Sequence, residues 1–566
     1  MKSPRFMRLL AGVFAISVLA SSFSWAQLSV AKVNAINKTL QSVKTAASKL
    51  DARHRQMLDG TANIVYLAGV WQKYGMHLTD PTFISHAKSM LHTGSQVPGV
   101  AGIVPASNPG NDVAFSSFGG FTQSETSTAR CGNSVVVGFN DSGSVFETPF
   151  FFSGMGGQAF SGYAFSSNGG ASFTDGGPVN PGPGDANFLG GDPGVNCADA
   201  NTFFYSQIFD FLDASSNPFA AIAVNKSTDG GKTWGDPVAA VAKSGFTHLL
   251  DKPWSTIDPS NTKRMFVSYT DFDFSGTSTA CPGDVRTAIE FVESDDGGAT
   301  WSATPNVAIE VCGAAAVQGS QMAVSSKGTL YISWVNLGSN FPVGIRELQI
   351  SNFAGGVLSA PVNVSAVQPG GDSFFLQGEF RDFLDMAMAI DHSGGASDGD
   401  LYITWSDGRD KIVPDPLGTD GAYAYDDVLV SQSFDGGNTW FGPFKVNSDF
   451  QPRLAGGRDH YQVGVSVDNR GVVGACWYDR RVDPENFAIR RHCGESGNNG
   501  FTFSDADIGL TPFAPTHGID IFINPIYMGD YDQMTSDFLN LNSGFIGSFQ
   551  AMGSRGNPDV FSHPMN

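Results

Sequence analysis

The chain has 566 residues, including 68 glycines, 29 prolines and 45 phenylalanines, and only 15% of its residues are charged. This length is too great for one ordinary compact core, and the composition suits short aromatic strands joined by tight turns, which excludes a mainly helical or disordered chain. The 54 acidic residues outnumber the 33 Lys and Arg residues. A surface of this sign repels phosphate backbones and argues against nucleic acid as a partner.

The first residues have the form of a secretory signal. Basic residues precede an apolar run over residues 9–19, and the small residues on either side of Trp25 predict cleavage before Gln27. An uncleaved membrane anchor is the alternative. That run is short for a membrane span, however, and no later stretch approaches about 20 apolar residues. Residues 1–26 are therefore predicted to be a signal peptide, and the protein to be secreted, periplasmic or extracellular, without a membrane span.

Residues 27–92 are predicted to be a helical N-terminal region. Apolar residues recur at three- and four-residue steps from Val33 to Leu50, which is typical of a helix, and a second helix is predicted over residues 63–74. These helices either pack on the main domain as a cap, which we favour, or bind a protein partner. Residues 93–112 are rich in Gly, Pro, Ser and Asn and are predicted to be a linker.

From about residue 113 onward a turn of the form Ser-x-Asp-x-Gly-x-Thr-Trp recurs. Three full copies occupy residues 227–234, 294–301 and 433–440. Two copies with Asn in place of Asp and Phe in place of Trp occupy residues 166–173 and 496–503. One degenerate copy without the acid occupies residues 351–358. The Asp or Asn can accept backbone hydrogen bonds, the glycines can take positive φ, and the aromatic residue begins the next strand. These turns are predicted to be structural and not catalytic.

An aromatic-rich strand, often ending in Asp, recurs between the turns. Its seven copies begin near residues 135, 202, 265, 330, 401, 472 and 544, and this spacing suits a four-stranded blade. Residues 113–566 are therefore predicted to be an all-β propeller with six or seven blades. We favour seven, with residues 113–120 completing the last blade; the alternative has six blades and a C-terminal appendage.

Six cysteines follow the predicted signal, which permits up to three disulfides among 15 pairings. Cys476 and Cys493 lie on successive predicted strands and are the best single candidate pair. Buried free thiols are the alternative. The cysteine spacings match no zinc motif.

The repeated turns resemble the Asp boxes, or BNR repeats, of the sialidase superfamily. The resemblance covers roughly residues 113–552 and implies a β-propeller that acts on or binds glycans. A sialidase would use three arginines to bind the sialate carboxylate, a Tyr nucleophile paired with Glu, and an Asp as acid and base. The first arginine of the family lies in an Arg-Ile-Pro segment, whereas residues 121–127 here read Phe-Thr-Gln-Ser-Glu-Thr-Ser. The protein is thus a candidate exo-glycosidase whose activity stays open.

Polar residues precede the predicted innermost strands, where the loops of a propeller converge on its axis. They include Glu125, Asp192, Asp251, Lys252, Gln321, Arg381, Asp382, Arg458, Asp459, Asp530 and Asp532. Acids crowded at the axis would raise each other's pKa values or hold a cation, so Ca²⁺ is a candidate cofactor and no other is expected. The alternative is that these residues cap strand ends and bind channel water.

A glycosidase would assign specific tasks within this set. Tyr531 would be the nucleophile, Glu379 its base, and Asp192 or Asp251 the acid. Arg381 and Arg458 would bind a carboxylate.

Two further substrate-binding candidates, Arg409 and Arg480, accompany Trp405 and Trp477 in Trp-Ser-Asp-Gly-Arg and Trp-Tyr-Asp-Arg-Arg segments. Salt bridges between blades are the structural alternative for these segments. Two hypotheses on function follow. In the first, the protein is a secreted sialidase-like propeller that binds an extracellular glycan or glycoprotein, and hydrolysis of this glycan is left open. In the second, it is a non-catalytic platform for adhesion or protein assembly.

Overall fold

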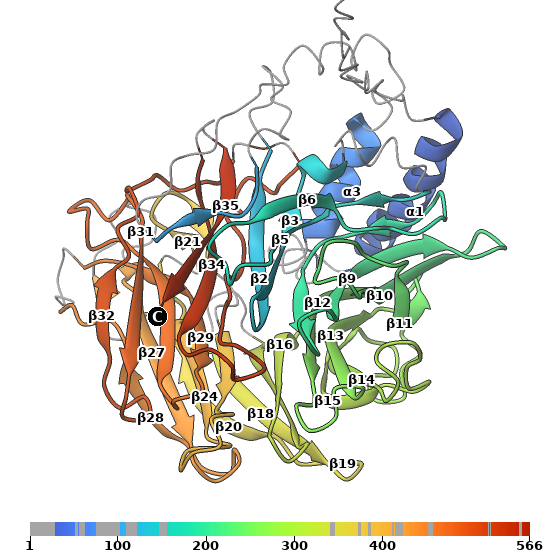
Figure 1. Cartoon of the computed structure of the whole chain (residues 1–566). Helices are drawn as coiled ribbons and strands as arrows, with labels where there is room; N and C mark the ends of the chain where they lie inside the picture. The colour runs from blue at the N-terminus through green and yellow to red at the C-terminus, as the bar shows by residue number, and fades with distance from the viewer. Residues whose placement is uncertain are drawn as a thin grey trace, which may run out of the picture.

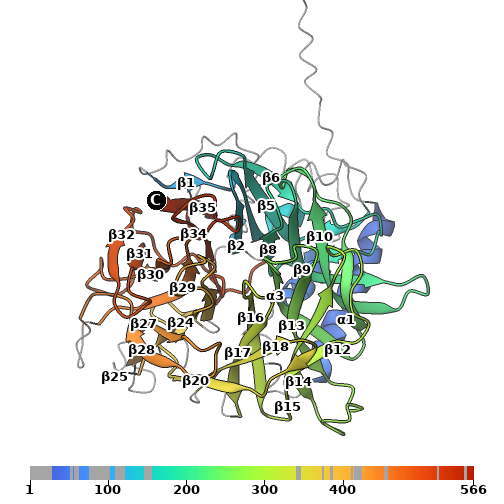
Figure 2. The ribbon, with the colours of Figure 1, turned by 60° about the horizontal axis from the view of Figure 1, so that its bottom comes forward.

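The computed structural model describes residues 29–50, 55, 63–74, 102–108, 121–145, 156–339, 346–371, 375–382, 386–409, 412–413, 423–450, 457–518, 520, 522–553 and 557–565. The described strands form a ring of seven sheets, with helices against one side of the ring (Figures 1 and 2). Within this part of the chain no helix is both long and apolar enough to cross a membrane. The predicted signal peptide lies outside the described residues.

Blades 1 to 3 each run from an innermost to an outermost strand. Blade 1 is β2 (Gln123–Cys131), β3 (Ser134–Asp141), β5 (Ser161–Ser166) and β6 (Thr174–Pro178). Blade 2 is β8 (Gly194–Cys197), β9 (Phe203–Leu212), β10 (Pro218–Ser227) and β11 (Val238–Ser244), with the short β7 (Phe188–Leu189) also beside β9 and β4 (Gln158–Ala159) beside β7. Blade 3 is β12 (His248–Ile257), β13 (Met265–Asp273), β14 (Arg286–Ser294) and β15 (Asn306–Cys312).

Blades 4 to 6 repeat this antiparallel order. Blade 4 is β16 (Ala316–Val324), β17 (Leu330–Gly338), β18 (Arg346–Ala354) and β20 (Val362–Val367), with β19 (Val357–Leu358) also beside β18. Blade 5 is β23 (Met386–Ile390), β24 (Leu401–Asp407), β27 (Asp427–Ser433) and β28 (Phe441–Lys445). Blade 6 is β29 (His460–Val467), β30 (Val473–Asp479), β31 (Arg490–Ser496) and β32 (Ser504–Asp507).

The seventh blade joins the two ends of the propeller. It consists of β33 (Met534–Thr535), β34 (Phe545–Met552), β35 (Pro558–Met565) and β1 (Val104–Pro105), and Val104 pairs with Ser562. The outermost strand therefore comes from the segment that the sequence predicts as a linker, and residues 113–120 lie outside the described residues. This arrangement explains why six turn motifs accompany seven blades: no turn connects the last two strands of blade 7, because they lie at opposite ends of the chain.

The repeated turns have the hydrogen bonds that their residue types predict. In the copy at residues 227–234, Asp229 Oδ1 accepts bonds of 3.0 Å from the backbone N–H groups of Lys232 and Thr233, and Oδ2 accepts one of 2.7 Å from Thr233 Oγ1. The two glycines that follow Asp229 have φ of 80° and 82°. The same bonds recur around Asp296 and Asp435. In each of these turns the Asp carboxylate is bonded within the turn itself, so the repeated turns are structural.

The aromatic repeat forms the second strand of each blade and fills the space between blades. Trp334 of β17, Trp405 of β24 and Trp477 of β30 are at most 1% exposed. Shorter strands lie outside the blades: β21 (Phe375–Leu376) pairs with β22 (Phe380–Arg381), and β25 (Ile412–Val413) pairs with β26 (Tyr423–Ala424). A 3₁₀ turn, η2 (Gly143–Val145), follows β3.

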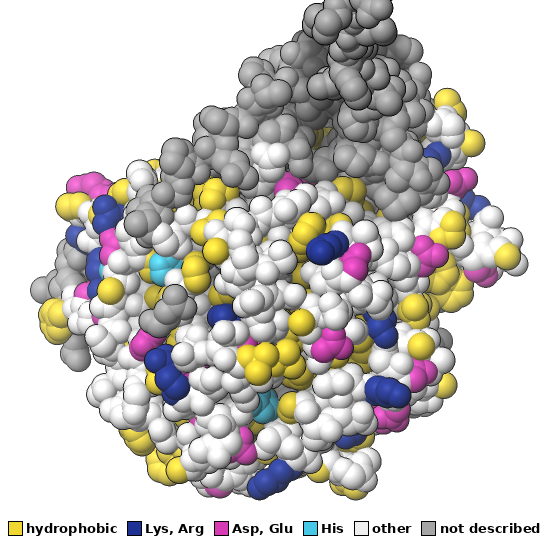
Figure 3. All heavy atoms as spheres, in the orientation of Figure 1, with side chains coloured by type: hydrophobic (Ala, Val, Ile, Leu, Met, Phe, Trp, Pro, Cys, Tyr) yellow, Lys and Arg dark blue, Asp and Glu magenta, His cyan; other side chains and the backbone are white. Residues whose placement is uncertain are grey.

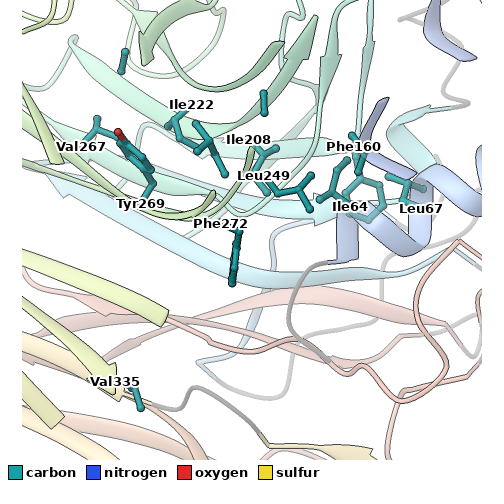
Figure 4. Packing of buried hydrophobic residues seen from close by; sticks show 14 of the residues in the cluster. Ile64, Leu67, Phe160, Ile208, Ile222, Leu249, Val267, Tyr269, Phe272 and Val335 are labelled. Carbon is teal, nitrogen blue, oxygen red and sulfur yellow. The ribbon is translucent and has the colours of Figure 1, made fainter. Parts of the chain in front are cut away.

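The described helices pack on the propeller. The predicted apolar stripe of α1 (Val30–Lys49) is buried, and α3 (Asn63–Tyr74) places Ile64 and Leu67 in the same core as Phe160 and Leu249 (Figure 4). The rings of Trp71 and Phe188 meet edge to face at 6.3 Å. Because the apolar sides of the helices contact the propeller, they contribute to its core as a packed cap.

All six cysteines pair within the described chain. Cys476–Cys493 joins directly opposite residues of β30 and β31, which confirms the predicted pair. Cys281–Cys312 also lies within one blade, whereas Cys131–Cys197 joins the innermost strands of blades 1 and 2. Three disulfides are consistent with an oxidising compartment.

Candidate functional site

Charged residues that precede the innermost strands meet in one buried group. Lys252 Nζ lies 2.8 Å from Glu125 Oε1, 2.8 Å from Asp530 Oδ2 and 3.3 Å from Asp192 Oδ2. Arg381 donates two bonds, of 2.9 and 2.8 Å, to the carboxylate of Asp530. Because these segments come from different sides of the ring, the group lies at the propeller axis. We call it the axial network: Glu125, Asp192, Asp251, Lys252, Arg381 and Asp530, each at most 6% exposed.

Three members of the axial network lie where the backbone departs from regular strand geometry. The pairing of β2 with β3 shifts between Ser124 and Ser127, and Glu125 within this bulge has a φ of 52°. Asp192 and Lys252 have φ of 58° and 50°, and the shift in β12 falls at Lys252. Such values cost of order 1–3 kcal/mol each for residues other than glycine and persist where the surroundings hold them. Here the ion pairs hold them.

The network contains four carboxyl groups and two cations, and its pKa values reflect this imbalance. Burial, followed by the nearby Asp192, raises the pKa of Glu125 to about 8. Burial also raises the pKa of Asp251 to about 6. For Asp530, burial is outweighed by Arg381 and Lys252, which lower its pKa, and the surrounding carboxyls raise the pKa of Lys252 well above its usual value despite burial. At neutral pH Glu125 therefore holds a proton that reduces the excess negative charge.

This retained proton predicts a pH-dependent stability. Between pH 4.5 and about 8, folded Glu125 keeps a proton that the unfolded chain releases, so the free energy of unfolding falls as the pH rises through this window. The Glu125→Gln variant has no such proton and should show a smaller fall of Tm between pH 5 and 8. Glu495→Gln, an exposed change on β31, serves as the control. Equal slopes for the wild type and Glu125→Gln would contradict the assignment.

The candidate nucleophile Tyr531 lies beside the network. Its hydroxyl donates a 3.2 Å bond to the Pro193 carbonyl, its ring meets Trp254 edge to face at 5.8 Å, and Lys252 Nζ lies 5.6 Å from its centroid. Burial and then Glu125 raise the pKa of Tyr531 well above its usual value. In this environment the side chain is a neutral phenol.

Glu379 and Arg458, the expected base and carboxylate-binding residue, occupy different surroundings. Glu379 is exposed on the turn between β21 and β22, whereas every member of the axial network is buried. Arg458 is half-buried and donates a 2.6 Å bond to the Gly457 carbonyl. Their roles stay predictions.

The remaining arginines make structural contacts. Arg409 Nε lies 2.7 Å from Asp407 Oδ1, Trp405 Nε1 donates to the same carboxylate at 2.9 Å, and Arg409 Nη2 reaches the Ala366 carbonyl of blade 4. This unit links blade 5 to blade 4. Arg480 Nη1 lies 3.1 Å from Asp459 Oδ2, and both side chains are buried. Of the four candidate arginines, Arg381 alone belongs to the axial network as defined from the described residues.

A cavity of about 330 Å³ continues along the axis beyond the network. Side chains from all seven blades line it, including Ser127, Asn196, Trp254, Met322, Met388, Val465 and Gln533. The lining residues Ser260, Ser326 and Asn540 at its far end are exposed, so the cavity opens where the innermost strands end. The accessible site is thus at the opposite end of these strands from the axial network.

Positive charge in the network comes from the protein itself. The Lys252 ammonium contacts three carboxyl groups, in the position at the axis where a Ca²⁺ ion was the prediction. Among the residues that the structure describes, no group of three or more His, Cys, Asp or Glu side chains is arranged to hold a metal ion.

No protein-family model and no curated protein matches the sequence. Solved structures with a similar course of the chain include an α-L-arabinanase from Penicillium chrysogenum in complex with arabinobiose (10% identity, 68% of this chain and 94% of that chain, TM-score 0.38). Another is an α-L-arabinofuranosidase from Fusarium graminearum (11% identity, 68% of this chain and 93% of that chain, TM-score 0.40). A third is an intramolecular trans-sialidase from Ruminococcus gnavus (12% identity, 66% of this chain and 94% of that chain, TM-score 0.36).

The chain is a seven-bladed β-propeller with a repeated Ser-x-Asp-x-Gly-x-Thr-Trp turn. This assignment rests on its own sheet topology and turn hydrogen bonds, because likenesses at these TM-scores do not bear on function.

Some site residues were missed in the sequence. Asn140 Nδ2 donates to Glu125 Oε2 at 3.0 Å and to Tyr527 Oη at 3.3 Å, and the Arg381 guanidinium lies 4.5 Å from the centroid of the Tyr527 ring. The cavity residues Met388 and Gln533 were also missed. Their signal was positional, since Met388 lies on the innermost strand β23 and Gln533 directly precedes the innermost strand β33, just after the segments that carry the charged residues.

Proposed function

We propose that the protein is a secreted propeller that binds an extracellular glycan in the axial cavity. The observation that carries this proposal is an accessible cavity in the size range of ligand pockets, lined by all seven blades, with aromatic and polar side chains together. Trp254 and Phe538 offer apolar surface, and Thr256, Ser466 and Gln533 offer hydroxyl and amide groups. A sugar presents the matching combination of C–H faces and hydroxyl groups.

Binding fits the geometry better than hydrolysis. Glycoside hydrolysis uses two carboxyl groups that flank the scissile bond, but the candidate acids Asp192 and Asp251 are at most 3% exposed. Asp537 is the one carboxylate among the described cavity-lining residues. It already accepts bonds from the backbone N–H groups of Gly132 at 2.9 Å and Leu539 at 3.1 Å. The cavity therefore offers recognition groups without an acid pair.

Secretion is supported by the predicted signal peptide and by three disulfides. The proposed ligand is accordingly a glycan outside the cytoplasm.

Filling the cavity should abolish binding. Arabinobiose is a suitable first probe, and titration calorimetry should give a dissociation constant that rises at least about tenfold in Met388→Trp, because the larger ring occupies ligand space. Phe450→Ala, a change at a side chain that is 87% exposed and does not line the cavity, should bind like the wild type. Equal melting temperatures would show that both variants are folded.

Two outcomes would contradict the proposal. Absence of binding by arabinobiose, lactose and 3′-sialyllactose at millimolar concentrations would favour the non-catalytic assembly platform. Release of methylumbelliferone from a sialyl or arabinosyl substrate at any pH from 4 to 8 would instead establish a hydrolase.

A further inference from the structure

We infer that the axial cavity selects an uncharged sugar unit over an anionic one, an inference that rests on the proposed glycan-binding function. The charges on the cavity wall are the first reason. Arg130 and Asp537 are the only Lys, Arg, Asp or Glu side chains among the described lining residues, and they have opposite signs. Burial lowers the pKa of the third titratable lining residue, His392, and leaves its imidazole neutral at pH 7.

Both charged side chains make contacts at the junction of blades 1 and 7, and of the Arg130 guanidinium only Nε has a hydrogen bond among the described residues. Arg130 Nε donates a 3.1 Å bond to the Gly132 carbonyl, and the N–H of the same glycine donates to Asp537 at 2.9 Å. Asp537 also accepts 3.0 and 2.7 Å bonds from the backbone and the side-chain amide of Asn542. A sugar carboxylate would need charge-assisted donors, typically a bidentate arginine, to offset its lost hydration. The described wall offers one arginine, Arg130, and it interacts electrostatically with the Asp537 carboxylate, which would compete with and repel a sugar carboxylate bound there.

Neutral polar groups remain for a ligand. Gln533 Oε1 accepts bonds from Ser127 Oγ at 2.7 Å and from the Thr128 N–H at 3.1 Å, whereas Gln533 Nε2 makes no hydrogen bond with any described residue. This amide donor suits the hydroxyl oxygens of a sugar, which accept hydrogen bonds.

The apolar side chains of the cavity wall and the net charge of the protein also favour an uncharged ligand. Met322, Met388 and Met534 add uncharged, polarisable surface to the cavity. The protein has a formal net charge of −21, and on the face shown in Figure 3 the charged side chains are scattered among uncharged ones. This negative charge disfavours the approach of an anionic ligand.

Matched pairs of sugars test this inference. Galactose with galacturonate, and glucose with glucuronate, differ by a carboxylate in place of the C6 hydroxymethyl group, and calorimetry at pH 7 should give at least tenfold weaker binding of the anionic member in each pair that binds. Met388→Lys, which places a cation in the cavity, should reduce this preference, and Met388→Gln, of similar length without charge, should not.

The two possible failures are distinguishable. If the anionic member binds as tightly as its neutral counterpart, the inference about charge is overturned while glycan binding stands. If neither these pairs nor arabinobiose bind, the proposed function itself is overturned.

Discussion

Replacing Lys252 with methionine should lower the free energy of unfolding by about 3–5 kcal/mol, the typical cost of removing one partner from a buried ion pair. The variant keeps a side chain of similar length but leaves Glu125, Asp192 and Asp530 without the ammonium that contacts all three. Arg381 still pairs with Asp530, so the loss falls mainly on the other two carboxyls. Urea denaturation of the secreted, oxidised protein measures the change.

A double variant separates charge from packing. Asp192→Asn combined with Lys252→Met removes one carboxyl group that the single variant leaves without its ammonium, and should recover part of the stability lost by Lys252→Met alone. A loss below about 1 kcal/mol for the single variant would show that the network does not hold the segments at the axis together.

Loss of the Cys131–Cys197 disulfide should destabilise the protein by about 4 kcal/mol, from the loop-closure entropy of a long chain segment. The two cysteines are 66 residues apart and join the innermost strands of blades 1 and 2. Urea denaturation of Cys131→Ala/Cys197→Ala measures this change. As a comparison, Cys476→Ala/Cys493→Ala removes a disulfide between cysteines that are 17 residues apart within one blade, and should lower the free energy of unfolding by less. A larger loss in the second variant would contradict this account.

The sequence predicted what depends on local chemistry. Each repeated turn uses bonds within about five residues, such as those from Lys232 and Thr233 to Asp229, so its pattern can be recognised in the sequence. The closure of blade 7 was not visible, because β1 has only two residues, Val104 and Pro105. So short a strand in a segment rich in glycine and proline has no periodicity to detect.

The sequence predicted where the charged residues of the axial network lie, but not which of them form ion pairs. Glu125, Asp192 and Asp251 were expected near the axis from their repeat position; all three are buried, and Glu125 and Asp192 both contact Lys252. The partners of Lys252 come from residues 60 to 278 positions away, and only the closed ring decides which acids meet one cation. The accessible end of the channel was also not predicted, since the exposure of the cavity rim depends on how the blades assemble.

The most direct test of the account is to locate a bound neutral disaccharide in a crystal of the secreted protein soaked in arabinobiose. The account predicts density in the axial cavity between Trp254, His392 and Gln533, with the Lys252–Glu125 and Arg381–Asp530 pairs unchanged. Density for the sugar at the other end of the axis, against Arg381 or Tyr531 and with those ion pairs broken, would contradict it.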